Sequence, residues 1–216
     1  MALFQKKPQF SKSAPLYTFG LQKSFLVVGL GNIGKEYDLT RHNIGFMCAD
    51  KLVKSLDLPD FILKKDLKCH VSIGNTGEKR IIIIKPTTLM NLSGQSVLAV
   101  MNFYKIPTED IIIIHDELDI DFGQIRTRLG GGSAGHNGIK SIVDAVGNEN
   151  SQKIGRVRIG VKNDKLAKID SADFVLGKFT KDEQALLPAM KREVNAVLTE
   201  IIYGNSISND TRSFLD

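Results

Sequence analysis

One stretch of this chain, "DIIIIHDEL" at residues 110–118, constrains the possible folds more than any other feature of the sequence. Side chains alternate between the two faces of a β-strand, so four consecutive isoleucines require both faces to be covered by other parts of the protein. Strands buried on both faces are typical of a sheet that lies between two layers of helices. The run therefore predicts a central strand of an α/β protein.

The rest of the sequence alternates between short apolar runs and segments with helical spacing of apolar residues. We expect strands at 25–30, 123–132 and 153–161, a pair of strands within 68–86 around a "GNTGE" turn, and helices at 43–56, 93–106, 135–147 and 180–202. Thr180 and Glu183 are spaced as a capping box at the start of the last helix, and Pro188 predicts a kink within it. The fold class that we predict is α/β, a single domain with a mixed, mostly parallel twisted sheet and helices on both faces.

The chain has 216 residues, which suits one sizeable core. Residues 1–24 contain neither Asp nor Glu and have no continuous apolar segment, so they do not resemble a secretory signal. We expect them to form a flexible N-terminal extension to an α/β domain at 25–216, with organelle targeting as the alternative.

Charge and cysteine content limit the partners and the compartment. With 29 basic and 24 acidic residues, the formal net charge is +5, which is weak evidence for a polyanionic partner. No run approaches the ~18 apolar residues of a membrane span. Cys48 and Cys69 stand alone without a CxxC pair, which argues against a disulfide framework and a thiolate zinc site. We expect a protein of a reducing compartment, the cytoplasm, that does not bind membranes.

The stretch "GLGNIG" at 29–34 matches the glycine pattern of a dinucleotide-binding loop. In that motif a helix begins within the glycines, so that its N-terminus faces the pyrophosphate. Here "KEYDLTRH" follows, and helical spacing starts only near Ile44. The acidic residue expected ~20 positions later would be Asp50, inside the predicted helix. We expect these glycines to turn the backbone and to hold Asn32 at the end of the first strand.

Several polar residues follow the C-terminal ends of predicted strands, where sites gather in open α/β sheets. Asn32 follows the first strand, and His42 ends the loop after it. Asn91 comes shortly after the "IIIIKP" strand, Asp116 follows "IIIIH", and Asn137 opens a helix after a glycine loop. We therefore expect these five side chains to share one crevice.

This set of side chains suits an acyl transfer to water. A histidine, with an ordinary pKa of ~6.5, accepts a proton from water at neutral pH, and a carboxylate on its second ring nitrogen fixes the tautomer. Asparagine amides position a carbonyl and stabilise the oxyanion that forms on it. We expect no nucleophilic serine, because G-x-S-x-G is absent and Ser93 is placed as a helix N-cap. We also expect no metal site, since no two histidines have the spacing of a ligand pair.

Each of these residues also has a purely structural interpretation. His42, Asn91 and Asn137 suit helix termini, and Asp116 suits a turn. His115 ends a buried strand and is expected to be structural, and His136 is expected to bond only to backbone. The position of all five candidates at one edge of the sheet favours a shared site.

Longer segments resemble one family. "VVGLGNIGKEYDLTRHNIGF", "KPTTLMNLSGQSV", "IIIIHDELDIDFGQIRTRLGGGSAGHNGIKSI", "RVRIGV" and "FVLGKF" occur in the same order as in bacterial peptidyl-tRNA hydrolases, from about Phe25 to the last helix. The resemblance implies a monomeric α/β enzyme without metal or other cofactor, whose partner is peptidyl-tRNA. It also implies cleavage of the ester that joins a peptide to the terminal ribose of tRNA.

The resemblance further implies a role for each site residue. His42 is the general base, Asp116 keeps it basic, and Asn32 helps to distinguish blocked peptidyl groups from free aminoacyl groups. The residues that would contact the peptide and the 3′ end are Tyr37, Leu89, Asn91 and Asn137. The basic surface that would face tRNA phosphates consists of Arg126, Arg128, Lys140 and Arg158.

The sequence departs from the family pattern at a few places. Ile33 stands where proline is usual, which predicts a looser loop around Asn32. Leu89 stands where an aromatic residue is usual, which predicts a weaker or absent stacking contact with the terminal adenosine. Ala134 replaces a common glycine beside Asn137, and "KNDKLAKIDSADF" lacks a usual His-Pro pair. None of these changes removes a proposed catalytic group.

Three other interpretations remain open at this point. The main alternative is a non-catalytic RNA-binding protein of the same fold, against which the presence of both His42 and Asp116 argues. A nicotinamide-dependent enzyme would use "GLGNIG", and a serine esterase would use Ser93.

Overall fold

The computed structural model describes residues 23–215 of the chain, so most of the predicted N-terminal extension lies outside the described residues. The strands are β1 (Ser24–Gly29), β2 (Ile62–Lys64), β3 (Cys69–Thr76), β4 (Lys79–Pro86), β5 (Ile111–Asp121), β6 (Gln124–Leu129), β7 (Gly155–Lys162) and β8 (Asp210–Ser213). The α-helices are α1 (Ile44–Ser55), α2 (Ser93–Tyr104), α3 (Asn137–Val146), α4 (Asn148–Ser151), α5 (Ser171–Leu176) and α6 (Lys181–Gly204). Short 3-10 helices include Arg41–Asn43 and Met90–Leu92.

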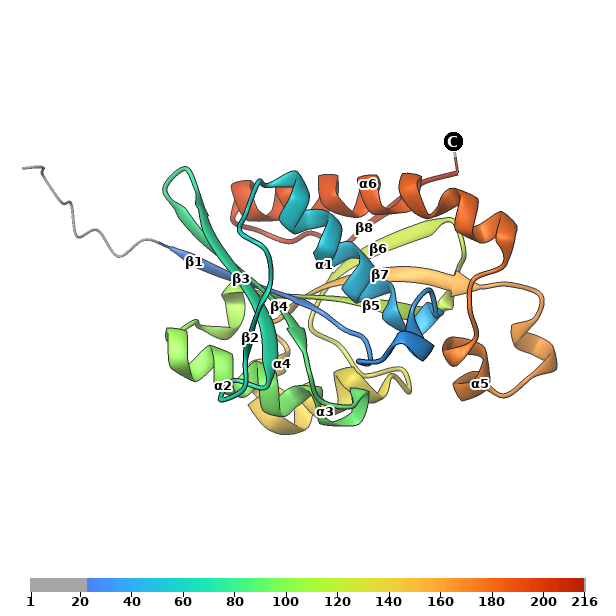
Figure 1. The fold of residues 1–216 in the computed structure, drawn as a ribbon, viewed down its shortest axis with the longest axis horizontal. Helices are drawn as coiled ribbons and strands as arrows, with labels where there is room; N and C mark the ends of the chain where they lie inside the picture. The colour runs from blue at the N-terminus through green and yellow to red at the C-terminus, as the bar shows by residue number, and fades with distance from the viewer. Residues whose placement is uncertain (1–22, 216) are drawn as a thin grey trace, which may run out of the picture.

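All eight strands of the described chain form one mixed sheet in the order β2-β3-β4-β1-β5-β7-β6-β8. The central strands β4, β1, β5 and β7 are mutually parallel, and β3 and β6 run in the opposite direction. Helices α1 and α6 cover one face of the sheet, and α2 and α3 cover the other (Figure 1). The predicted α/β class with helices on both faces is confirmed.

The isoleucine runs divide between two cores, one on each side of the sheet. Ile112 and Ile114 of β5 pack with side chains of α1 and α6, whereas Ile111 and Ile113 pack with side chains of α2 and α3. All four are buried. Burial of one such side chain contributes ~1.5–3 kcal/mol, so the alternation holds β5 firmly at the centre of the molecule.

Helix α6 begins with the predicted capping box. The Glu183 amide donates to the Thr180 hydroxyl over 3.2 Å, and the Thr180 amide donates to the Glu183 carboxylate over 2.7 Å. The helix continues through Pro188 to Gly204. No helix of residues 23–215 is both long and apolar enough to cross a membrane.

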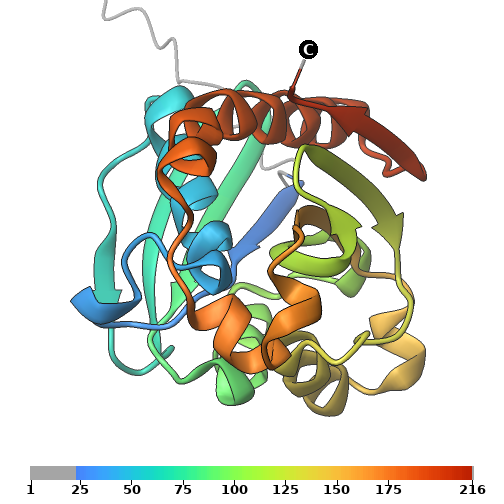
Figure 2. The same cartoon turned by 90° about the vertical axis from the view of Figure 1, so that its right-hand side faces the viewer.

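The C-terminal ends of the parallel strands β4, β1 and β5 point to the same edge of the sheet, and β5 continues from its last pairing with β1, at Ile114, to Asp121. Figure 2 looks onto this edge, with α5 in orange on the near side. Gly45 of α1 packs against the backbone here, because a Cβ at Gly45 would collide with Ile114 and Leu30. This close approach brings the 3-10 helix at Arg41–Asn43 beside the middle of β5, where Asp116 lies.

Candidate active site

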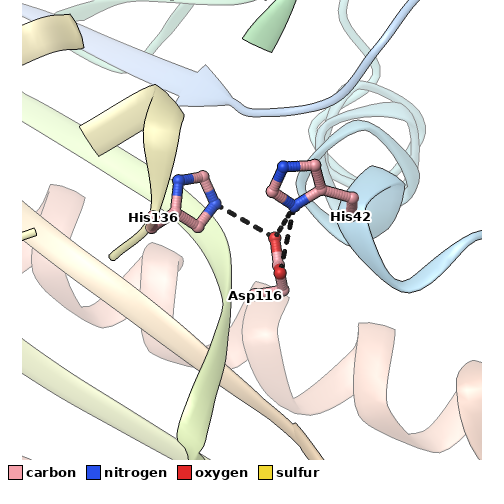
Figure 3. Close-up of side chains that lie close together, drawn as sticks. All are labelled: His42, Asp116 and His136. Atoms are coloured by element: carbon pink, nitrogen blue, oxygen red, sulfur yellow. Dashed lines mark hydrogen bonds and ion pairs between the residues drawn. The ribbon is translucent and has the colours of Figure 1, made fainter. Parts of the chain in front are cut away.

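His42 and Asp116 meet beyond the end of β1, beside the middle of β5, because Asp116 lies within this strand and not after it. The Nδ1 atom of His42 lies 2.9 Å from one carboxylate oxygen of Asp116 and 3.1 Å from the other. Asp116 is 2% exposed and His42 is 8% exposed. A carboxylate only accepts hydrogen bonds, so it holds the proton of His42 on Nδ1 and leaves Nε2 as the free base. In Figure 3 this second nitrogen points away from the carboxylate.

His136 provides a second hydrogen bond to Asp116, which the sequence did not predict. The Nδ1 atom of His136 accepts hydrogen bonds from the amides of Gly138 and Ile139, over 3.1 and 3.3 Å, and so caps helix α3. Its proton therefore lies on Nε2, which donates to Oδ1 of Asp116 over 3.1 Å (Figure 3). The prediction that His136 bonds only to backbone was wrong.

The charge of Asp116 is held by these two rings. Burial alone raises the pKa of Asp116. The nearby His42 and His136 lower it by more than burial raises it, through their charge and their hydrogen bonds, so the pKa of Asp116 lies well below its usual range. His115 is also buried. Its burial, and to a lesser extent the nearby His136, lowers the pKa of His115 well below its usual value. His115 is therefore neutral, and its Nδ1–H donates to the Asp116 carbonyl over 2.7 Å.

Arg41, directly before His42, ties this segment to the C-terminal part of the chain. Its guanidinium contacts Glu183 over 2.7 Å and donates to the carbonyls of Gly177 and Lys178 over 3.2 and 3.0 Å. The cation also lies 4.4 Å from the ring centre of Phe174 in α5. The buried Arg41 thus fixes the backbone of the 3-10 helix that carries His42.

Asn32 is held at the end of the first strand, as the sequence predicts. Its backbone is clamped by Asn43, which accepts from the Asn32 amide over 2.8 Å and donates to the Asn32 carbonyl over 2.9 Å. The side-chain oxygen of Asn32 accepts from the Met90 amide over 3.0 Å. The side-chain NH₂ of Asn32 therefore remains available as a donor.

A cavity of about 590 Å³ joins most of the predicted site residues. Asn91 follows β4, Asn137 begins α3, and both are exposed at its wall. Tyr37 is not among the lining residues, although the sequence places it with the substrate contacts. The lining residues are Asn32, His42, Leu89, Met90, Asn91, Asp116, Glu117, Leu118, Ala134, Gly135, His136, Asn137, Asp170, Ser171, Ala172, Val175 and Leu176.

Basic side chains gather on the neighbouring strands β6 and β7. Arg126 lies opposite Arg158 in the register, and Arg128 lies opposite Arg156, so all four point to one face of the sheet. Arg126, Arg128 and the α3 residue Lys140 are exposed, whereas Arg158 is half-buried and pairs with Glu117 over 3.0 Å.

Arg156 was not predicted, and it is buried beneath this basic surface. It donates to the carbonyls of Gly131 and Gly132, both over 2.6 Å, in the loop that leads to His136. Burial, together with the neighbouring Arg128 and Arg158, lowers the pKa of Arg156 to about 10. This arginine links the basic surface to the glycine loop of the site.

The structure does not support the nucleotide-loop and serine interpretations. Helix α1 begins at Ile44, well after the glycines, as expected for a loop that does not bind pyrophosphate. Ser93 is fully buried and its hydroxyl donates to the Met90 carbonyl over 2.9 Å. Ser93 is the first residue of α2 rather than its N-cap, so that prediction was wrong.

His42, Asp116 and His136 also form a possible metal-ligand set. Within residues 23–215, their donor atoms lie within 4.8 Å of one another. Two histidines and a carboxylate suit a transition metal in general. Here the nitrogens that face Asp116 are engaged in hydrogen bonds with it, so a metal would replace both bonds.

Comparisons with known proteins agree with the resemblance in the sequence. A family model described as peptidyl-tRNA hydrolase matches residues 26–214. The chain is 44% identical over 161 residues to a peptidyl-tRNA hydrolase of Rickettsia bellii strain RML369-C, covering 74% of this chain and 84% of the relative. A relative of the same name from Bdellovibrio bacteriovorus is 44% identical over 178 residues, covering 82% and 92% of the two chains.

A solved structure has the same fold. The crystal structure of peptidyl-tRNA hydrolase from Acinetobacter baumannii at 1.00 Å resolution is similar, with a TM-score of 0.75 and 34% identity. The similarity covers 85% of this chain and 91% of that one.

Proposed function

Because this chain belongs to the peptidyl-tRNA hydrolase family, we propose that its reaction takes place in the cavity beside His42 and Asp116. The chain is an enzyme that hydrolyses peptidyl-tRNA. We infer that water attacks the ester between the peptide and the terminal ribose directly. The observation that carries this proposal is the Nδ1 contact of His42 with Asp116, which leaves the opposite ring nitrogen free.

In the proposed first step, Nε2 of His42 takes a proton from a water molecule while the water oxygen bonds to the ester carbonyl carbon. Asp116 stabilises the imidazolium that results. General-base assistance of this kind contributes ~10²–10⁴-fold to the rate. In the second step the tetrahedral intermediate collapses, and the imidazolium returns its proton to the departing ribose oxygen. The products are the free peptide and tRNA.

We assign the amide groups at the wall of the cavity to the substrate. The free NH₂ of Asn32 would donate to the carbonyl of an N-blocked residue, whereas the ammonium of a free aminoacyl group offers only donors. Asn91 and Asn137 would hold the peptide and the 3′ end, and Leu89 would contact the terminal adenosine weakly. Tyr37 does not line the cavity, so its proposed contact has no support from the geometry.

We assign the tRNA phosphates to the surface of Arg126, Arg128, Lys140 and Arg158. Like charges directly opposite each other on neighbouring strands destabilise a sheet. Arg126 and Arg128 each lie opposite another arginine and have no carboxylate partner within residues 23–215, so they suit a surface that meets an anion, whereas Arg158 already pairs with Glu117. Arginine binds phosphate well because its planar fork matches two oxygens.

We further propose that the enzyme acts as a monomer, without a metal, in the cytoplasm. The residues of the proposed site come from one chain. Cys48 and Cys69 are buried and free, which suits a reducing compartment.

The test is release of tRNA from an N-acetylated aminoacyl-tRNA. We expect release by the wild-type protein, unchanged by EDTA and by Ser93→Ala if that variant folds, and much slower release from the unblocked aminoacyl-tRNA. A non-catalytic RNA-binding protein would bind the substrate and leave the ester intact. Covalent labelling by an organophosphate would favour a serine esterase instead.

A further inference from the structure

We propose that a basic hollow next to the active site binds the peptide part of the substrate beyond its first residue and favours acidic side chains there. The hollow has a volume of about 550 Å³, and its wall includes Lys65, Lys68, Thr88 and Gln95. It is separate from the cavity that contains His42. This inference rests on the proposed function, because it assigns a second part of the same substrate.

The hollow begins one residue away from the active-site cavity along two segments of the chain. Asn32 lines the cavity and Ile33 lines the hollow. In the same way Leu89 lines the cavity and Thr88 lines the hollow. Successive Cα atoms are ~3.8 Å apart and an extended peptide spans ~3.3 Å per residue. A peptide of a few residues, with its ester beside His42, would therefore reach the hollow.

The strand order shows which part of the substrate would point in this direction. The arginines assigned to tRNA lie on β6 and β7, on one side of the β1–β5 pair. The hollow lies on the other side, where Leu63 belongs to β2, His70 belongs to β3, and Thr87 directly follows β4. The ester joins the tRNA to the peptide at His42. With the tRNA phosphates over β6 and β7 and the terminal adenosine at Leu89, on the wall of the active-site cavity, the hollow beyond Thr88 is left for the peptide.

The chemistry of the hollow fits the oxygen atoms of a peptide. No carboxylate is among its lining residues in the described part of the chain. Lys68 Nζ donates to the side-chain oxygen of Gln95 over 2.6 Å, which leaves the Gln95 NH₂ free to donate. Lys65 is exposed. These donors and cations would bind backbone carbonyls and the carboxylates of Asp or Glu.

Two apolar side chains complete the wall of the hollow. Ile33 is 44% exposed and Leu63 is 49% exposed. They would pack against the aliphatic parts of the peptide. Ile33, which stands where the family usually has proline, would thus contact the substrate.

The experiment compares two substrates of different length in steady-state kinetics. One is N-acetyl-aminoacyl-tRNA, whose single residue does not reach the hollow, and the other is a tetrapeptidyl-tRNA with Glu at the residues beyond the first. The variant is the double substitution Lys65→Glu and Lys68→Glu. The matched control is Lys64→Glu, because Lys64 is an exposed neighbour that does not line the hollow.

For the double variant we expect KM for the acidic tetrapeptidyl-tRNA to rise by about fivefold for each lysine, as for an exposed ion pair worth up to ~1 kcal/mol, with kcat unchanged. KM for the acetylated substrate is expected to stay the same. The Lys64→Glu control is expected to match wild type on both substrates.

Two results would overturn the inference while leaving the proposed function intact. One is an unchanged KM for the tetrapeptidyl substrate in the double variant. The other is an equal rise in KM for both substrates, which would mean that the lysines act on the tRNA. Absence of hydrolysis of either substrate by the wild-type protein would contradict the proposed function, and this inference with it.

Discussion

His136 donates a hydrogen bond from Nε2 to the same Asp116 oxygen that lies 2.9 Å from His42, over a distance of 3.1 Å. The amides of Gly138 and Ile139 fix the proton of His136 on this nitrogen. Asp116 is therefore held from two sides as a charged group in a buried place. A carboxylate held in this way keeps the ring of His42 in one tautomer and one orientation.

The first prediction concerns this second histidine. His136→Ala removes a hydrogen bond to a charged group, worth ~1.5–3 kcal/mol, and so loosens Asp116. We expect kcat to fall by about 10- to 100-fold with little change in KM, and His136→Gln to recover part of the loss because its NH₂ still donates. If both variants showed the same rise in KM and no change in kcat, this positioning role would be contradicted. Steady-state kinetics on N-acetyl-aminoacyl-tRNA gives both constants.

The second prediction is a pH dependence of stability that comes from Asp116. Its pKa in the folded protein lies well below the value of ~3.9 in an unfolded chain, so the unfolded chain takes up the proton first as the pH falls. The carboxylate therefore stabilises the fold fully above about pH 4, and this contribution is lost progressively below that pH.

Urea unfolding of wild type and Asp116→Asn between pH 7 and pH 2.5 measures this effect. We expect wild type to be the more stable protein at pH 7 and the difference to shrink below about pH 4. A difference in unfolding free energy that stays constant over the whole range would be incompatible with the lowered pKa.

The third prediction concerns the buried contact between Arg41 and Glu183, whose side chains are 4% and 10% exposed. Removing one partner of a buried ion pair costs ~3–5 kcal/mol, because the other charge stays buried. We expect Arg41→Met to lower the unfolding free energy by about this amount. The double variant Arg41→Met with Glu183→Gln is expected to lose less than the sum of the losses in Arg41→Met alone and Glu183→Gln alone.

The control for this double-mutant comparison is the exposed pair of Lys162 and Asp121, whose side chains are 49% and 69% exposed. Lys162→Met is expected to change the unfolding free energy by ~1 kcal/mol or less. Strictly additive effects of the Arg41 and Glu183 substitutions in urea unfolding would show that the two residues are not coupled.

The fourth prediction concerns the basic surface on β6. A protein that neutralises phosphates releases counterions, and each duplex phosphate contact contributes ~0.9 to the slope of log K against log salt. We expect Arg126→Ala and Arg128→Ala each to reduce the slope for tRNA binding by about this amount. Arg192→Ala, at an exposed position of α6, is expected to leave the slope unchanged. If all three variants kept the wild-type slope, Arg126 and Arg128 would not contact tRNA phosphates.

The central strands could be predicted from the sequence because their signal is local. In β5 four successive isoleucines indicate that both faces of the strand are buried. Strands β2 and β8 were missed, because β2 has three exposed residues and β8 has the polar sequence "DTRS". Their pairing with β3 and β6 depends on the finished sheet and leaves no periodic signal in the chain.

The site could be predicted in part for the same reason. His42 and Asn32 follow the end of β1, Asp116 lies in the part of β5 that extends beyond β1, and parallel strands bring such residues to one edge. The contact of His136 with Asp116 depends on the path of the glycine loop, which Arg156 holds from below. The partner of Arg41 lies 142 residues away in the sequence, so no local pattern could identify it.

The central claim is that the ring of His42 takes the proton of the attacking water. The most direct test is the single-turnover rate of tRNA release from saturating N-acetyl-aminoacyl-tRNA by wild type and His42→Ala, with tRNA affinity measured in parallel. We predict that the substitution lowers the rate by ~10²–10⁴-fold and leaves the affinity for tRNA within about twofold of wild type, as expected for a group that acts on the water. A His42→Ala protein that binds tRNA normally and releases it at the wild-type rate would contradict the account.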